Sequence, residues 1–290
     1  MALKPWLLAS RPKTLPAAIA PVMVGAALAY DAGVFRWLPA TICLVFALLI
    51  QIGTNFANDY FDFKKGADTK DRVGPTRAVA AGLIQPETMK RVTAITFLIA
   101  FCVGLGLIPF GGWWLLAVGV TSILCGYAYT AGPFPLAYVG LGDVFVMLFF
   151  GVVAVSCTFY VQAGYFTREV FLVATALGGL STNLLVVNNI RDIETDRLAN
   201  KRTLAVRLGR TFSIWEYRSF MLWSQIAVVW LAFRLNDSWV QLPLLTLPLV
   251  ILLGIKLGRA NSGPEYNRLL AKTALLLVLY SVTLAIGLWI

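Results

Sequence analysis

Stretches of about 20 apolar residues recur along the whole length of this chain of 290 residues. A helix needs ~20 consecutive apolar residues to cross the hydrocarbon core of a bilayer, and these stretches have that length without a polar face. Hydrophobic residues make up 59% of the chain and charged residues 13%, which is about half of the charged fraction in soluble domains. The chain is therefore expected to fold in lipid.

Nine segments are predicted to span the membrane. Backbone N–H and C=O groups in hydrocarbon must bond within their own segment, so each span is expected to be an α-helix. The predicted fold class is all-α, a polytopic membrane protein with one domain over residues 1–290. The spans are expected near residues 15–33, 38–58, 92–109, 112–130, 142–161, 169–189, 212–233, 239–257 and 270–290.

Lysine and arginine are distributed unevenly between alternate connections. With the N-terminus inside the cell, 21 of the 24 basic residues fall on the cytoplasmic side, and only Arg36, Arg168 and Arg234 fall on the other. This bias follows the positive-inside rule. The net charge of +10 therefore reflects orientation and does not indicate nucleic-acid binding, although the basic loops also suit anionic lipid or an anionic substrate.

Cysteine and histidine usage narrows the chemistry. The four cysteines are far apart in apolar stretches, without the close spacing of a zinc site or a disulfide framework, so they are interpreted as packing residues. The chain has no histidine. A histidine general base, a haem-binding histidine and a histidine metal site are therefore excluded.

Acidic side chains cost ~2.5 to 3.5 kcal/mol at the centre of a span on insertion scales, so their positions are informative. The predicted cytoplasmic end of the second span carries Asn55, Asn58, Asp59 and Asp62, and Asp68 follows in the loop. Residues three and four apart share one face of a helix. The helix-borne amides and carboxylates are therefore expected to point in one direction.

The sixth span ends in the same pattern, with Asn188, Asp192 and Asp196 spaced four residues apart. Carboxylates one helical turn apart repel each other unless a cation lies between them. Magnesium binds carboxylate and water oxygens and commonly shares its remaining positions with substrate phosphates. The two clusters therefore predict a site for Mg²⁺ and a diphosphate. The lysines and arginines that follow both clusters would stabilise a departing pyrophosphate.

Other interpretations remain for the same residues. An acidic pair near a helix end is usually a solvated face that pairs with nearby Lys or Arg, but two asparagine-headed clusters at corresponding helix ends favour the metal site. A secondary transporter is the alternative of a different class. It predicts charged sites near the bilayer midplane, whereas both clusters lie at one predicted surface.

Two further features lie outside the acidic clusters. The segment Arg-Pro-Lys-Thr-Leu-Pro at residues 11–16 is interpreted as an anchor at the membrane interface, with Trp6 at the level of the lipid headgroups. Tyr129 and Tyr138 lie around the connection between the fourth and fifth spans. They belong either to an aromatic substrate pocket or to an interface belt, and the pocket is slightly favoured.

The pattern Asn58-Asp59-x-x-Asp62, together with Asp192-x-x-x-Asp196, resembles the paired aspartate motifs of the UbiA-type intramembrane prenyltransferase superfamily. That resemblance implies nine helices around a central cavity and the binding of a Mg²⁺-diphosphate. Longer strings resemble one branch, the 1,4-dihydroxy-2-naphthoate polyprenyltransferases of menaquinone synthesis. They lie at residues 11–16, 58–68, 74–77, 140–143, 189–196 and 201–209.

The resemblance also implies roles for individual residues. The carboxylates expected to hold Mg²⁺ are Asp59, Asp62, Asp68, Asp192 and Asp196, of which all but Asp68 are also the expected catalytic residues. The amides expected to support them or the substrate are Asn55, Asn58 and Asn188. The diphosphate is expected to contact Lys65, Arg77, Lys201 and Arg202. The wider superfamily often has an acidic residue where this chain has Gly66. The sequence therefore does not identify the third metal ligand of the first cluster.

The reaction that the resemblance implies begins with ionisation of a polyprenyl diphosphate to an allylic cation. The ring carbon of 1,4-dihydroxy-2-naphthoate that carries the carboxylate then attacks, and loss of CO₂ gives demethylmenaquinol. A bacterial plasma membrane is the implied location, with membrane lipid around the protein. Another acceptor of the same superfamily, such as 4-hydroxybenzoate, homogentisate, haem or a glycerol phosphate, is the alternative. The isoprenoid length and the oligomeric state stay open.

Overall fold

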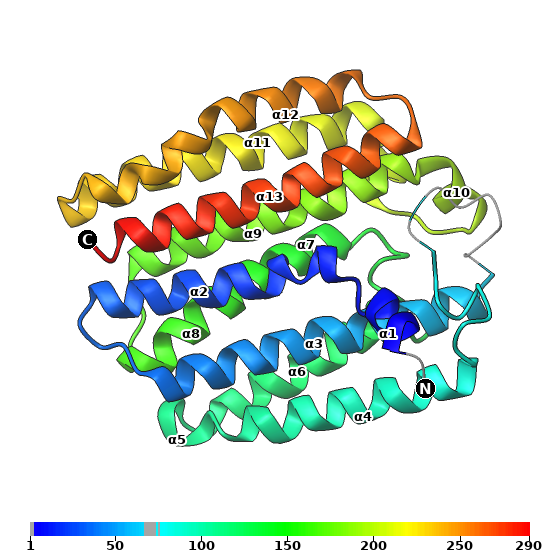
Figure 1. The fold of residues 1–290 in the computed structure, drawn as a ribbon, viewed down its shortest axis with the longest axis horizontal. Coiled ribbons are helices and arrows are strands. Elements are labelled where there is room, and N and C mark those ends of the chain that lie inside the picture. Colours follow the sequence, from blue (N-terminus) through cyan, green and yellow to red (C-terminus); the bar gives the residue numbers. More distant parts are fainter. Residues whose placement is uncertain (1–2, 67–73, 75) are drawn as a thin grey trace.

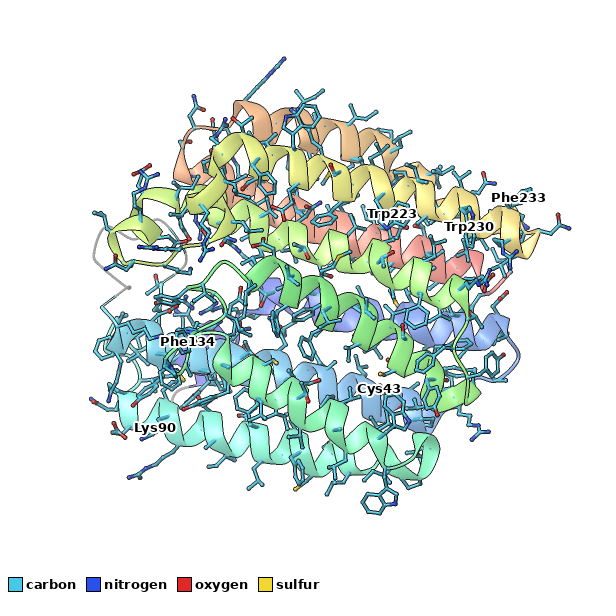
Figure 2. The ribbon with its side chains drawn as sticks, turned by 180° about the vertical axis from the view of Figure 1, so that it is seen from behind. Cys43, Lys90, Phe134, Trp223, Trp230 and Phe233 are labelled. Carbon is cyan, nitrogen blue, oxygen red and sulfur yellow. The ribbon has the colours of Figure 1, made fainter. Side chains whose placement is uncertain are left out.

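The computed structural model describes residues 3–66, 74 and 76–290, and every regular element among them is a helix. The long helices lie side by side with nearly parallel axes, and the two chain termini lie at opposite ends of the bundle (Figure 1). Lys90, at the start of one helix, lies at the same end of the bundle as Phe134 (Figure 2). The expected all-helical fold is confirmed.

Six helices among the described residues are long and apolar enough to cross a membrane. They are α3 (Trp37–Lys64), α4 (Pro86–Leu105), the run of α7 (Gly142–Val146), η2 (Met147–Val153) and α8 (Ala154–Ala163), α9 (Arg168–Arg191), the run of η3 (Trp239–Thr246) and α12 (Leu247–Arg259), and α13 (Gly263–Gly287).

The N-terminal helices form a bent pair that would make a seventh span. The first part comprises α1 (Leu3–Ser10) and η1 (Pro12–Thr14), and it meets α2 (Pro16–Asp31) at an angle of 54°. Pro16 starts α2, a position where the missing N–H of proline costs no helical hydrogen bond.

Two further apolar helices lie outside this set. The helix α6 (Trp114–Ala128) is only 15 residues long. The helix α11 (Leu204–Leu235) is interrupted at Gly209, whose φ of 84° falls in a region that glycine tolerates. The expected count of nine spans therefore stays a prediction. The short helices α5 (Ile108–Gly111) and α10 (Ile193–Leu198) connect longer ones.

The outer surface of the bundle is apolar. Phe233 is 82% exposed, Leu245 73% and Leu98 60%, and Trp230 and Phe233 lie together near the end of α11 in Figure 2. Monomeric soluble proteins rarely expose large contiguous apolar patches, whereas lipid is a suitable solvent for them. The chain is an integral membrane protein.

Close backbone packing fixes the middle of the bundle. A methyl group added at Gly178 of α9 would lie 2.6 Å from the backbone oxygen of Met147 in η2. Only a residue without Cβ permits this approach. The π-helical turn of η2 widens the helix at the same level. Together these features hold the run from α7 to α8 against α9, where its other face can form the wall of a cavity.

The helix α3 holds the N-terminal bend in place. The amide of Asn55 donates to the backbone oxygen of Ser10 at 2.9 Å and to the hydroxyl of Thr14 at 3.2 Å, and the amide of Gln51 also donates to Thr14 at 3.1 Å. These bonds fix the residues between Ser10 and Thr14, including Arg11, against the C-terminal half of α3.

Candidate active site

An apolar cavity of about 280 Å³ lies between α2, α3, α6, η2 and α9. Along α3 its lining extends from Cys43 to Asn58, which is ~22 Å at 1.5 Å per residue. Cys43, which is labelled in Figure 2, lines the apolar part of this cavity. Polar lining residues of several elements occupy the other end, namely Arg11, Asn55, Asn58, Tyr129 and Asn188. The cavity therefore combines a long apolar wall with one polar end.

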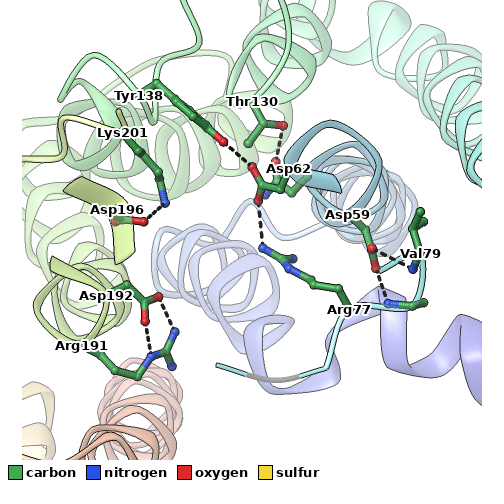
Figure 3. Close-up of polar contacts among 12 residues, drawn as sticks. Asp59, Asp62, Arg77, Val79, Thr130, Tyr138, Arg191, Asp192, Asp196 and Lys201 are labelled. Carbon is green, nitrogen blue, oxygen red and sulfur yellow. Dashed lines mark hydrogen bonds and ion pairs between the residues drawn. The ribbon is translucent and has the colours of Figure 1, made fainter. Parts of the chain in front are cut away.

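The polar end adjoins the carboxylates of both predicted clusters (Figure 3). Asp62 of α3 is buried, and its Oδ1 accepts a hydrogen bond of 3.0 Å from the hydroxyl of Tyr138. Its Oδ2 pairs with Arg77 at 3.0 Å. The structure thus brings together three predicted site residues, Asp62, Arg77 and Tyr138.

Asp59 has different partners. Both of its oxygens accept backbone N–H groups, from Ala78 at 3.0 Å and from Val79 at 3.1 Å, and the side chain points away from Asp62 (Figure 3). Asp59 is 1% exposed. It therefore holds the turn that presents Arg77 to Asp62.

Asp192 lies where α9 ends and α10 begins. Arg191 binds it with two hydrogen bonds, of 2.8 Å from Nε and 2.7 Å from Nη2, and also donates to Asn267 of α13 at 2.7 Å. A two-bonded guanidinium–carboxylate pair has fixed geometry. The orientation of Asp192 is therefore set by its neighbour in the sequence.

Asp196 of α10 has one oxygen in an ion pair and one without a partner. Its Oδ1 lies 3.2 Å from Lys201 Nζ, while its buried Oδ2 has no hydrogen-bond partner. Burial raises the pKa of this carboxyl above its ordinary value; Lys201 opposes that shift, and repulsion from Asp192 and Asp62 adds to it. Negative charges from both clusters therefore meet here.

Lys65 connects the first cluster to the connection between α6 and α7. Its ammonium donates to the backbone oxygen of Thr130 at 2.6 Å and lies 4.4 Å from the ring centre of Tyr138. Partial burial lowers the pKa of Lys65, and Asp62 opposes that shift. The hydroxyl of Thr130 in turn donates to Asn58 at 2.8 Å. This chain of contacts joins the carboxylates to the cavity wall.

Only some of the other predicted site residues line the cavity. Asn188 donates to the backbone of its own helix at 3.1 Å, and it lines the cavity together with Tyr129. The backbone N–H of Arg202 donates to the backbone oxygen of Tyr138 at 2.9 Å, and the side chain is exposed. Asp68 lies outside the described residues. The polar environment favours the pocket interpretation of Tyr129 and Tyr138 over an interface belt.

The donor chemistry of this site suits Mg²⁺. Carboxylate and amide oxygens are its usual protein ligands, and Asp196 Oδ2 is a buried acceptor that is free to take a cation. Among the described residues, however, no three Asp, Glu or Cys side chains lie close enough together to hold a metal ion. Asp62, Asp192 and Asp196 are instead paired with Arg77, Arg191 and Lys201, respectively.

Sequence reasoning missed several contributors. Thr130 bridges Asn58 and Lys65, and only its position next to Tyr129 could have indicated it. Arg191 pairs with Asp192, its neighbour in the sequence, and no spacing pattern indicated that contact. Arg11 was interpreted as part of an interface anchor, yet it lines the cavity.

Residues 18–278 match the model of the UbiA prenyltransferase family. The chain belongs to this family. The UbiA match covers most of the chain and includes both aspartate clusters, the cavity wall on α3 and α9, and the connection that carries Tyr138.

Curated UbiA relatives agree with one branch of the family. The chain is 41% identical over 256 residues to 1,4-dihydroxy-2-naphthoate octaprenyltransferase of Escherichia coli strain K12. The aligned region covers 85% of this chain and 82% of that protein. It is 35% identical to the protein of the same name from Haemophilus influenzae, over 99% and 96% of the two chains. The Mycobacterium leprae relative of that name is also 35% identical.

Solved UbiA structures share the fold. The apo structure of a UbiA homolog from Aeropyrum pernix K1 superposes with a TM-score of 0.74 at 12% identity, covering 95% of this chain and 98% of that one. A UbiA homolog from Archaeoglobus fulgidus bound to GPP and Mg²⁺ gives a TM-score of 0.63 at 14% identity, covering 97% and 99%. These likenesses establish the UbiA fold for this chain.

Proposed function

We propose that this protein transfers a polyprenyl group from a polyprenyl diphosphate to 1,4-dihydroxy-2-naphthoate, releasing diphosphate and CO₂ and forming demethylmenaquinol. The observation that carries the proposal is a long apolar cavity whose polar end adjoins the two aspartate clusters in a UbiA family member. Relatives at 35% to 41% identity over most of the chain bear the name of this activity. The protein is a prenyltransferase.

Asp62, Asp192 and Asp196 would hold Mg²⁺ together with Asp59, and Asp68 is a further candidate ligand. Bound Mg²⁺ would neutralise the diphosphate and stabilise the charge of the leaving pyrophosphate. Support for this role comes from the buried, partnerless Oδ2 of Asp196. The UbiA homolog from Archaeoglobus fulgidus that binds GPP and Mg²⁺ has the same fold.

The basic residues of the site would contact the diphosphate. Lys65, Arg77 and Lys201 lie beside the carboxylates, so they can bind phosphate oxygens that approach the same acids. Arg202 would add a further cation from the exposed side. These cations offset the charge that develops on pyrophosphate as the allylic bond breaks.

The membrane arrangement completes the proposal. The bent N-terminal pair, α6 and α11 would join the six long helices to give nine spans in one domain around the cavity. The acid-rich end would face the cytoplasm of a bacterial cell, in accordance with the positive-inside rule. The polyprenyl tail would lie along the apolar wall between α3 and α9.

An acceptor panel tests the proposed reaction. Purified protein in detergent would receive one polyprenyl diphosphate, Mg²⁺ and, in separate reactions, 1,4-dihydroxy-2-naphthoate, 4-hydroxybenzoate or homogentisate. Demethylmenaquinol and one equivalent of CO₂ are expected from the naphthoate only. Product from another acceptor in place of the naphthoate would refute the assignment of the acceptor while leaving the prenyltransferase chemistry intact.

A further inference from the structure

Arg11 is the only charged residue in the cavity lining among the described residues. The lining comprises 39 residues, and the carboxylates of both clusters lie beyond it. An aromatic acid that enters such a cavity carries a full negative charge into an apolar environment. That charge is costly unless a cation meets it. The wall offers Arg11 for this purpose.

The position of Arg11 is fixed by the fold. Its backbone has φ 50° and ψ 69°, a left-handed conformation that costs free energy for a residue with a Cβ. The bonds from Asn55 and Gln51 to Ser10 and Thr14 hold the segment on either side of it. The turn itself is closed by Thr14, whose backbone N–H donates to the Arg11 oxygen at 2.9 Å. Arg11 is therefore presented to the cavity by a built turn and is not a chance surface cation.

The Arg11 guanidinium interacts electrostatically with the carboxyl group of Asp59 and with the phenol of Tyr129. Arg11, Tyr129 and Asn188 all line the same cavity. An aromatic ring whose carboxylate contacts Arg11 would thus lie near Tyr129, at the end of the cavity where the diphosphate is expected.

We propose that Arg11 binds the carboxylate of the aromatic acceptor and so selects an acidic acceptor and orients its reacting carbon. The inference rests on the proposed function and names the residue that recognises the acceptor. The C1–O bond of the isoprenoid breaks and its electron pair leaves on diphosphate, and the ring carbon of the acceptor then forms a bond to the allylic C1. The bond to the carboxylate then breaks, CO₂ departs, and the electron pair restores the aromatic ring. No external oxidant, reductant or proton is needed.

The test compares Arg11→Met with Lys13→Met in the full-length protein. Lys13 belongs to the same short segment, is exposed and does not line the cavity, so it controls for the loss of one positive charge. Equilibrium binding of 1,4-dihydroxy-2-naphthoate is followed by the fluorescence of the naphthalene ring. Arg11→Met is expected to raise the Kd roughly 10- to 100-fold, the usual worth of a charge-assisted contact. Lys13→Met should leave it within about twofold.

Two further ligands identify what Arg11 binds. The neutral 1,4-dihydroxynaphthalene lacks the carboxylate, so its affinity should be equal for wild type and Arg11→Met. The KM for polyprenyl diphosphate should change less than about threefold, and Arg11→Lys should recover part of the naphthoate affinity. Equal weakening for the neutral diol would mean that Arg11 only shapes the pocket. A loss of diphosphate affinity as large as that for the naphthoate would assign Arg11 to the diphosphate. Either result overturns the inference.

The two proposals fail in distinguishable ways. If wild type converts the naphthoate and Arg11→Met binds it normally, the role of Arg11 is refuted and the proposed function stands. If wild type neither binds nor prenylates the naphthoate, the proposed function fails and the role of Arg11 fails with it. A melting curve for each variant in detergent confirms that a change in affinity does not reflect unfolding.

Discussion

The hydroxyl of Tyr138 donates a hydrogen bond of 3.0 Å to Oδ1 of Asp62, 76 residues earlier in the chain. The backbone oxygen of Tyr138 accepts the N–H of Arg202 at 2.9 Å. One residue of the connection between α6 and α7 therefore contacts both Asp62 of the first cluster and the segment that follows the second cluster. It links the two halves of the site at the polar end of the cavity.

Replacing Tyr138 tests this link. Tyr138→Phe keeps the ring that faces Lys65 but removes the donor to Asp62. A hydrogen bond to a charged group contributes ~1.5 to 3 kcal/mol, so kcat is expected to fall roughly 10-fold. Steady-state rates would be compared with those of Tyr165→Phe, an exposed position outside the site. Equal rates for both variants would show that the bond has no catalytic role.

The carboxylate of Asp196 is expected to be essential. Asp196→Asn removes the negative charge at the buried oxygen that has no partner, and turnover should fall at least ~10²-fold because charge stabilisation is lost. Glu194→Gln provides the control, since Glu194 lies on the same short helix in an exposed pair with Arg197. Prenyl transfer in membranes would be measured for both. A folded Asp196→Asn enzyme with near-normal turnover would contradict the metal role.

Chelation should stop the reaction. Excess EDTA is expected to abolish prenyl transfer, and added Mg²⁺ should restore it, because the diphosphate needs a cation between it and the acids. Product formation would be followed before and after each addition. Activity that persists after thorough chelation would exclude a metal-dependent mechanism.

Asp59 is expected to affect stability as well as turnover. The two oxygens of Asp59 accept the N–H groups of Ala78 and Val79. Asp59→Asn replaces one of these oxygens with an NH₂ group, which donates and cannot accept a hydrogen bond. A buried backbone donor without an acceptor costs ~1 to 3 kcal/mol, so the melting temperature should fall together with activity. Thermal unfolding in detergent measures the first effect. An unchanged melting temperature would show that the turn does not depend on this carboxylate.

The contact between η2 and α9 predicts a strong effect of a small substitution. Gly178→Ala would place a methyl group 2.6 Å from the oxygen of Met147 and is expected to lower the melting temperature by several degrees. Gly254→Ala is the matched control, because its new methyl group would lie at an ordinary 3.6 Å from Arg218. Similar melting temperatures for the two variants would show that the helices can separate at little cost.

Much of the fold could be predicted because lipid requires long apolar helices. The span expected at 169–189 is Arg168–Arg191, and that expected at 239–257 is Trp239–Arg259. The two acidic clusters could be placed at one end because four predicted spans separate them, and an even number of crossings returns the chain to the same side. Figure 3 shows both clusters in one region.

The contacts inside the site could not be predicted in the same way. Asp59 binds backbone groups of residues 78 and 79, which carry no side-chain signal in the sequence. Adjacent residues on a helix point in different directions, so Arg191 would not be expected to contact Asp192. It does so because Asp192, with φ −99° and ψ 10°, lies just outside the helix. Such pairings depend on where the chain leaves helical geometry.

The positive charge of Arg11 in the cavity wall has a consequence for turnover. An aromatic acid enters as an anion, but decarboxylation converts it into a neutral hydroquinone with a long hydrocarbon tail. The attraction that retained the substrate at Arg11 is therefore lost during catalysis. Product inhibition should be weak, and the hydroquinone should partition into the surrounding bilayer, where a membrane-bound enzyme could use it next.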